Sequence, residues 1–431
     1  MKKLLLCSLS LLLLLSPLAA GGDKESSAEK SGRTVIHFYD WAPTDTSIID
    51  DFNAANPDVY VEFHSIPDNG GDKLVQLDIL AMGGGEIDVM PGSDGEQMVR
   101  MKNGIYAPLD AFIERDGIDM AASFGDVLSY ASYNGVTYGY PFRSTVEGIW
   151  YNKDLFDEAG IPYPDGSWTW DEYKEIAQKL TKGTGSGKVY GTYTHVFNGQ
   201  WAPVANEVAP WYGEDGLSNI NSEAFRTQLE RRKELDDLGY QLSYSQIQAT
   251  KATQAAYFLG GKCAMVQAGS WLLQNIKDQE NYPHTFRIGV APLPRYDESV
   301  ESTNNFTVAA SILAIPANSK HKEEAWRFIR YMVEEGALRI AATGNYPCYR
   351  PAYDDELISA FIEGSGLSVD DVRLLFGDLT SLDQQPTGAA AAEYQLSMQE
   401  QVPLFLNGEK SLEEVLSNIQ RITDAAIAKE Q

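Results

Sequence analysis

Residues 34–90 alternate between strand and helix patterns, and this alternation constrains the fold more than any other feature. A β-α-β-α-β order predicts a parallel sheet covered by helices. In such sheets ligands bind beyond the carboxyl ends of the strands. We therefore predict an α/β protein with a site at these strand ends. The strand patterns lie at 34–38, 59–63 and 87–90, and the helix patterns at 48–55 and 73–82.

The length of the chain predicts more than one lobe, because 431 residues exceed a single typical core. A hydrophobic content of 43% and a charged content of 22% are ordinary for a globular protein and argue against disorder. The net charge of −27 repels phosphate backbones and anionic lipid. We therefore expect neither nucleic acid nor a membrane surface as a partner.

The N-terminus has the pattern of an export signal. Lys2 and Lys3 precede the leucine-rich run 4–15, and small residues follow at 19–22. This predicts a signal peptide over residues 1–21 and a flexible polar tail over 22–33. Two cysteines remain after it, Cys263 and Cys348. An oxidising compartment permits a disulfide, but the sequence leaves open whether the two come within reach.

Local signals place several elements further along the chain. Asn152 caps a helix after the strand 146–151, and Gly160 ends that helix. Thr169 and Glu172 have the spacing of a capping box. Further predictions are strands at 262–267, 287–291 and 307–315, a helix at 250–259, and another beginning at Trp271 with Ser270 as its N-cap.

No catalytic or metal signature stands out. The loop 183–188 resembles a phosphate cradle, but Lys182 and Val189 occupy positions where a P-loop needs Gly and Ser or Thr. G-x-S-x-G and H-E-x-x-H do not occur. The five histidines are far apart in sequence, so we predict no metal site, although carboxylate calcium sites stay open. Among 61 acidic residues some pair always has glycosidase spacing, so that spacing is uninformative. We predict no cofactor and no catalytic residue.

Aromatic residues give the positive signal, with 8 Trp and 23 Tyr. Aromatic rings stack on the C–H faces of sugars, while amides, carboxylates and guanidinium groups bond the hydroxyls. A single loop tryptophan is about as often a buried anchor, but four together favour sugar binding. The four loop tryptophans are Trp41, Trp201, Trp211 and Trp271, whereas Trp150, Trp168, Trp170 and Trp326 have core patterns.

Three charged residues have alternative interpretations. Asp45 follows Trp41 and could stabilise the N-terminus of the next helix instead of contacting a ligand. Asp94 could stabilise its glycine-rich turn. Arg143 lies between apolar strand segments, so it needs either a buried partner or a cleft.

Several segments, in this order, are similar to the sugar-binding (family 1) group of extracellular solute-binding proteins of ABC importers. The resemblance runs from Thr34 to nearly the end of the chain. The segments are 35–41, 81–89, 138–142, 150–156 with 159–162, 168–172, 258–265 with 269–271, 314–316 and 324–329.

The resemblance implies an α/β, two-lobe periplasmic-binding-protein fold of type II, maltose-binding-protein-like, with the ligand cleft between lobes. It implies lobe one at 34–141 plus 304–345 and lobe two at 142–303 plus 346–431. Many relatives are lipoproteins with a cysteine where Gly21 stands here. This departure argues against a lipid anchor and favours a soluble periplasmic protein.

The function implied is non-enzymatic: a monomer that captures a mono- or oligosaccharide and delivers it to the ABC transporter permease subunits. The alternatives are a binding protein for another solute, such as a polyamine, a phosphate ester or a metal, and an exported glycoside hydrolase. The ligand-binding residues implied by position are Trp41, Asp45, Ser93, Asp94, Gln97, Arg143, Gly269, Ser270, Trp271, Tyr346 and Arg350, with Trp201 and Trp211 in a variable part of lobe two.

Overall fold

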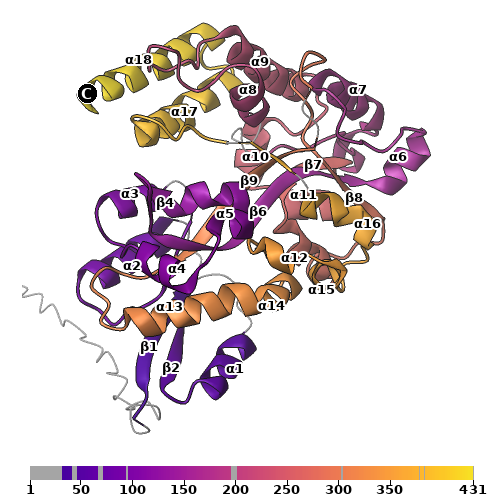
Figure 1. The fold of residues 1–431 in the computed structure, drawn as a ribbon. Coiled ribbons are helices and arrows are strands. Elements are labelled where there is room, and N and C mark those ends of the chain that lie inside the picture. The colour runs from indigo at the N-terminus through magenta and orange to yellow at the C-terminus, as the bar shows by residue number, and fades with distance from the viewer. Residues whose placement is uncertain are drawn as a thin grey trace, which may run out of the picture.

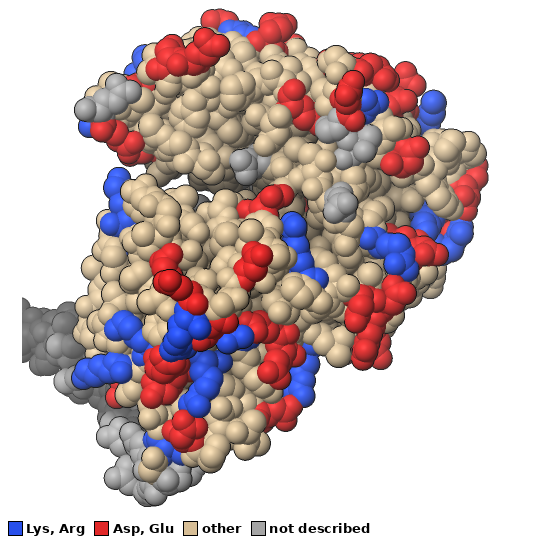
Figure 2. Space-filling view, viewed as in Figure 1, with Lys and Arg blue, Asp and Glu red and all other residues tan. Residues whose placement is uncertain are grey.

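The computed structural model describes residues 32–40, 46–66, 71–93, 96–195, 201–301, 304–377, 379–382 and 384–430. The chain forms two α/β lobes (Figure 1). The end of the chain, at helices α17 (Ala391–Leu406) and α18 (Leu412–Glu430), covers the upper lobe, and the first strands and helices form the lower one. Figure 2 shows a hollow between the two lobes and mixed acidic and basic side chains on this face.

Lobe one begins with the predicted alternation of strands and helices. Strand β1 (Thr34–Asp40) pairs in parallel with β2 (Val59–Ser65), as predicted, and α1 (Ser47–Ala55) connects them. Helix α2 (Gly71–Met82) leads to β3 (Met90–Gly92), which lies slightly later than predicted. Strand β3 pairs antiparallel with β9, and the segment just before it joins β1 through an isolated parallel bridge between Phe38 and Val89 and backbone hydrogen bonds to His37 and Tyr39.

One long strand passes from lobe one into lobe two. Strand β6 (Gly139–Asn152) contains the predicted strand 146–151 but begins earlier. It pairs antiparallel with β9 (Asn305–Ala314), with a register shift between Pro141 and Arg143. Around this pair lie β7 (Met265–Gly269), β8 (Ile288–Ala291) and β10 (Tyr346–Pro347) on β6, and β11 (Thr380–Leu382) on β9.

The predicted helix signals in lobe two are confirmed. The Asn152 side chain accepts a hydrogen bond from the Leu155 amide at the start of α6 (Lys153–Ala159), and Gly160 ends this helix in the left-handed conformation. Thr169 and Glu172 form a reciprocal capping box on α7 (Trp170–Leu180). A capping box satisfies two amide groups that the first helical turn leaves without partners.

Two helix predictions were wrong in detail. The predicted helix 250–259 begins only at Gln254, as α11 (Gln254–Leu259), because the preceding helix α10 (Tyr244–Thr250) ends at Thr250 and Lys251 adopts a left-handed conformation with φ 51°. Helix α12 (Leu272–Lys277) begins after Trp271, and Ser270 is not its cap. The Ser270 hydroxyl instead accepts a hydrogen bond from the Val146 amide on β6.

The remaining helices complete the two lobes. Trp150, Trp168, Trp170 and Trp326 are buried, as their patterns predicted. Within the described ranges, no helix has the length and apolarity needed to cross a membrane. The other helices are α3 (Glu96–Lys102), α4 (Asp110–Asp116), α5 (Met120–Phe124), α8 (Ala202–Glu207), α9 (Glu223–Asp237), α13 (Lys322–Arg330), α14 (Ala337–Ala342), α15 (Asp355–Ile362) and α16 (Val369–Val372).

Candidate functional site

A cavity of about 440 Å³ lies beside the strands that connect the lobes. Its walls come from α5, β6, β9, β10 and the segments that follow β10. Small-molecule sites in proteins typically occupy about 300–1,000 Å³ and combine apolar walls with a few polar groups. Polar and aromatic side chains on its walls include Phe124, Asp126, Ser144, Tyr346, Arg350 and Tyr353.

Arg350 supplies the cationic group of this cavity. Its guanidinium lies against the backbone of Gly125, where an added Cβ would come within 2.1 Å of Arg350 Cζ. Gly125 also has a φ of 57°, so a side chain is disfavoured there on two grounds. Among the residues that the structure describes, none forms a hydrogen bond or an ion pair with this guanidinium. Its five N–H donors can therefore bind a ligand.

Tyr346 and Arg350 are thus the two predicted residues that line the cavity. Tyr346 is buried, and its hydroxyl donates a hydrogen bond of 2.5 Å to the Leu375 carbonyl. Its ring stacks on Phe376, with 4.8 Å between centroids. Tyr346 therefore contributes mainly a ring edge to the wall, because its polar atom already has a partner.

The predicted turn Gly269–Ser270–Trp271 lies against the same strand, β6. The Ser270 amide donates to the Val146 carbonyl at 2.8 Å, and Gly269 pairs with Glu147. An added Cβ on Gly269 would lie 2.5 Å from the indole nitrogen of Trp271 and 2.3 Å from Thr145. Glycine is therefore required here because the half-buried indole folds back over the turn.

Glu147 lies on the face of β6 opposite the cavity. Successive residues of a strand point to opposite faces, so Thr145 and Glu147 face away from the cavity residues Ser144 and Val146. One Glu147 carboxylate oxygen accepts hydrogen bonds from Thr307 at 3.2 Å and from Gln384 at 2.5 Å. Desolvation raises the pKa of this carboxyl, and the hydrogen bonds partly oppose that effect.

Arg143 has a buried partner, which resolves the alternatives that the sequence left open. Its guanidinium donates two hydrogen bonds to the Asp40 carboxylate, at 2.7 and 2.8 Å. The two side chains are only 8% and 0% exposed. This bidentate pair ties the end of β1 to β6. Arg143 stays a predicted ligand contact, and in the structure both of its terminal nitrogens bind the Asp40 carboxylate.

Ser93 and Gln97 lie at the end of β3, beside the lobe-one half of β9. Both are buried, and Gln97 is only 2% exposed. Neither amide atom of Gln97 has a hydrogen-bond partner among the described residues. A buried amide without partners is unusual in native proteins. Gln97 therefore stays a candidate contact. Trp41, Asp45 and Asp94 lie outside the described residues.

Trp201 and Trp211 occupy the core of lobe two. Trp201 has no exposed surface, and the rings of Trp211 and Phe225 lie 5.0 Å apart between centroids. Tyr394 on α17 covers Trp211 edge-on. Other side chains cover both indole rings, so in this structure neither offers a stacking face. The alternative interpretation, that a loop tryptophan anchors its loop, describes both.

Sequence reasoning missed Phe124, Asp126, Ser144 and Tyr353 on the cavity wall. The serine could have been found from the period of two along β6, once the neighbouring strands were known. The others come from short helices and turns without a distinctive local pattern.

The two cysteines are buried free thiols, so the structure contains no Cys263–Cys348 disulfide. Burial raises the pKa of Cys348 to about 12, so this thiol on the cavity wall is unreactive.

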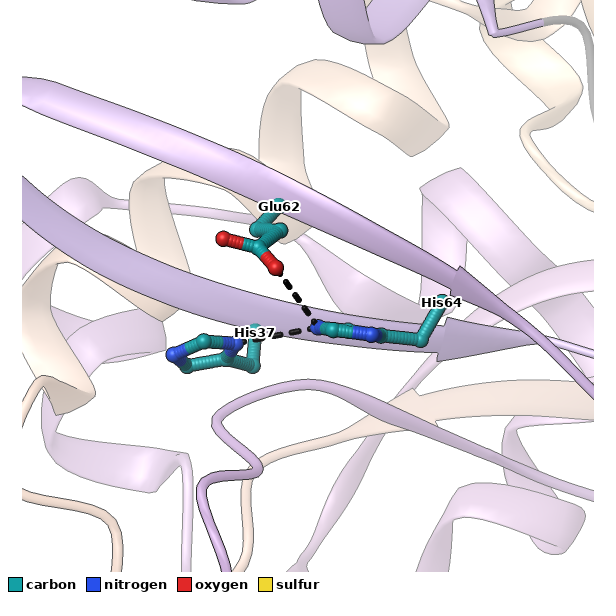
Figure 3. Close-up of side chains that lie close together, drawn as sticks. All are labelled: His37, Glu62 and His64. Carbon is teal, nitrogen blue, oxygen red and sulfur yellow. Dashed lines mark hydrogen bonds and ion pairs between the residues drawn. The ribbon is translucent and has the colours of Figure 1, made fainter. Parts of the chain in front are cut away.

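A second polar cluster lies on the sheet of lobe one. His37 and His64, although separated in sequence, approach within 3.0 Å, and Glu62 is beside them (Figure 3). The argument that distant histidines cannot share a site was therefore wrong for this pair, because the parallel register of β1 and β2 brings them together.

Comparison with known proteins agrees with this fold. A putative binding protein of Brucella abortus is 27% identical over 347 residues, covering 77% of this chain and 76% of the relative. The "Multiple sugar-binding protein" of Streptococcus mutans is 24% identical over 345 residues, covering 75% and 76%. An ABC substrate-binding protein of Listeria monocytogenes, solved in complex with cycloalternan, is 22% identical with a TM-score of 0.74, covering 92% and 99%.

The family model described as bacterial extracellular solute-binding protein matches residues 40–338. This match spans more than half of the chain, including all of β6, β7 and β9. The two-lobe architecture and the cavity at the connecting strands have the form expected of such proteins. The chain therefore belongs to the bacterial extracellular solute-binding protein family.

Proposed function

We propose that this protein captures a mono- or oligosaccharide between its lobes and delivers it to the permease of an ABC transporter. The observation that carries the proposal is the cavity of about 440 Å³ at the connecting strands, with the Arg350 guanidinium on its wall. The names of the Streptococcus mutans relative and of the cycloalternan complex support a sugar as the ligand class.

Tyr353 and Arg350, which both line the cavity, would divide the recognition of the sugar between them. The phenol ring supplies an apolar face for the C–H side of a sugar ring, and the guanidinium supplies donors for its hydroxyl oxygens. The Trp271 indole lies over Gly269 on the Thr145 face of β6 and is not part of this cavity. The paired strands β6 and β9 would act as the hinge, and a ligand that binds the closed form more tightly shifts the protein toward it. For the lobes themselves we keep the boundaries 34–141 plus 304–345 and 142–303 plus 346–431.

We propose further that the protein binds without catalysis. A glycoside hydrolase needs two carboxyl groups about 5–10 Å apart across one sugar. Among the described residues that line the cavity, Asp126 is the only carboxylate. Glu147 lies on the other face of β6 and already binds Thr307 and Gln384. Release of a chromogenic glycoside by the purified protein would refute this part of the proposal.

A phosphorylated solute is the second candidate, because a guanidinium on a cavity wall also suits an anionic group. Export through the signal 1–21, without a lipid anchor, and a monomeric state complete the proposal. Mass spectrometry of the mature N-terminus and light scattering would test these two points.

The decisive experiment is a thermal-shift screen against mono- and oligosaccharides, with sugar phosphates as the second set, followed by calorimetry on the hits. We expect a neutral sugar to bind, and Tyr353→Ala to weaken its binding at least tenfold while the protein stays folded. Tyr163→Ala, which removes an exposed aromatic ring on lobe two, is the matched control and should leave the affinity unchanged. Equal affinity in wild type and Tyr353→Ala would refute the placement of the site.

A further inference from the structure

The half-buried face of the β1–β2 sheet carries an unusual group of side chains. The register sets His37 opposite Glu62 and Tyr39 opposite His64, so all four project from the same face. The other face, with Ile36, Phe38 and Val61, belongs to the apolar core. In Figure 3 the two imidazoles and the Glu62 carboxylate converge, from two neighbouring strands, on one point.

The distances in this cluster fit metal coordination. Nδ1 of His37 lies 3.0 Å from Nε2 of His64, and Oε1 of Glu62 lies 3.7 Å from the same Nε2. All three ligand atoms lie within 4.8 Å of one another. Two ligand nitrogens that each bind a zinc ion at about 2.0–2.1 Å, at a tetrahedral angle, are about 3.3 Å apart. Small side-chain rotations therefore suffice to admit an ion.

The surroundings of the two rings suit this role. Nε2 of His37 lies 3.5 Å from a carboxylate oxygen of Glu86, which would accept its proton and leave Nδ1 free to bind. A carboxylate behind a metal-binding histidine commonly fixes the tautomer in this way. The His64 ring stacks on Tyr39, with 4.4 Å between centroids, which holds its orientation. The side chains of His37, His64 and Glu62 are 16%, 29% and 40% exposed, so an ion can reach them.

We propose that His37 Nδ1, His64 Nε2 and the Glu62 carboxylate bind one divalent transition metal ion of the zinc class. Glu86 is the positioning residue, and water completes the coordination. Two imidazoles and a carboxylate are donors that zinc accepts. The ion would join β1 to β2. This site is separate from the cavity, because none of its residues lines that space. The proposal is therefore independent of the proposed sugar binding.

The opposing view is that the two histidines merely share an N–H···N hydrogen bond. A hydrogen bond of that kind needs no ion and gives no saturable metal binding, so the two interpretations predict different titrations.

The test is calorimetric titration of the untagged, EDTA-treated protein with Zn²⁺ at high salt, which suppresses binding to scattered surface carboxylates. We expect one ion per chain with a Kd in the micromolar range or below. His37→Ala and His64→Ala should each weaken binding at least tenfold, and Glu86→Gln by about 10–100-fold at most. His284→Ala, a histidine on an exposed loop of lobe two, is the matched control and should change nothing.

Two further measurements distinguish a loss of metal binding from the unfolding of a variant. Co²⁺ should give a visible absorption spectrum in the wild type that His64→Gln, a milder change, loses. Excess Zn²⁺ should raise the unfolding temperature of the wild type but not of His64→Gln. The proposal is overturned if Zn²⁺ shows no saturable site. It is overturned equally if several weak sites persist unchanged in His37→Ala and His64→Ala, since these would be surface carboxylates.

Discussion

Two arginines beside the connecting strands, Arg143 and Arg350, differ in what surrounds their guanidinium groups. They are close in the fold, because Pro347 pairs with Arg143 across β10 and β6. Arg143 is buried and held by two hydrogen bonds to Asp40. Arg350 lies on a cavity wall against Gly125, without an ion-pair partner in the described part of the chain. The difference shows that the surroundings of two neighbouring arginines can assign one guanidinium to an internal ion pair and leave the other facing a cavity.

Removing Arg143 should give the largest effect on stability. Arg143→Leu leaves the Asp40 carboxylate buried without its cation, which costs about 3–5 kcal/mol in comparable pairs. Urea denaturation of wild type and variant should show this loss as a lower midpoint with an unchanged slope. Adding Asp40→Asn to Arg143→Leu should recover part of it, because the uncompensated charge is gone. A loss below about 1 kcal/mol would mean that the pair is not buried in solution.

Removing Arg350 should affect binding and leave stability almost unchanged. Arg350→Gln keeps a polar side chain but loses the guanidinium, so we expect about a tenfold weaker affinity for the sugar found in the screen, or about 1.4 kcal/mol. Calorimetry measures the affinity, and denaturation checks the fold. Arg287→Gln, an exposed arginine paired with Asp154 and Asp157, is the matched control. If both variants bind like wild type, the difference between the two arginines has no functional meaning.

The buried carboxyl of Glu147 extends the comparison to an anionic group. Its replacement should give the smallest effect of the three substitutions. Its folded pKa is raised above the ordinary 4.5, so the folded state holds the proton more tightly than the unfolded state does. This contribution to stability is complete below pH 4.5 and is lost as the pH rises through the raised pKa.

Glu147→Gln cannot lose that proton. Relative to wild type, the variant should therefore gain stability as the pH rises from 4 toward 7. Denaturation at pH 4, 5, 6 and 7 measures the difference. Glu280→Gln, at an exposed position of lobe two, is a control without a change in burial. A difference that stays constant across this range would contradict the raised pKa.

Local sequence was sufficient for features that depend on neighbouring residues. Asn152, Gly160 and the Thr169–Glu172 box each act within one helical turn, so the pattern and the structure agree. The family segments, taken in order, were sufficient for the two-lobe fold. Prediction weakened where two distant segments meet.

Distant partners decided the outcome for the candidate site. Asp40 lies 103 residues before Arg143, and nothing near Arg143 indicates that partner. Trp211 has the local setting of an exposed loop residue, yet Tyr394 on the later helix α17 covers it. His37 and His64 became neighbours only through the register of two parallel strands. Burial and pairing of this kind depend on tertiary contacts that a single sequence does not display.

The register shift between Pro141 and Arg143 has a mechanical consequence. Strands β6 and β9 stay hydrogen-bonded on both sides of it, so any rotation of one lobe against the other has to bend this ladder. Pro141 has no amide proton to donate, and a shifted register locally interrupts the ladder. We therefore expect the β6–β9 ladder to bend most easily at this register shift. The shift lies one residue away from the ion pair between Arg143 and Asp40.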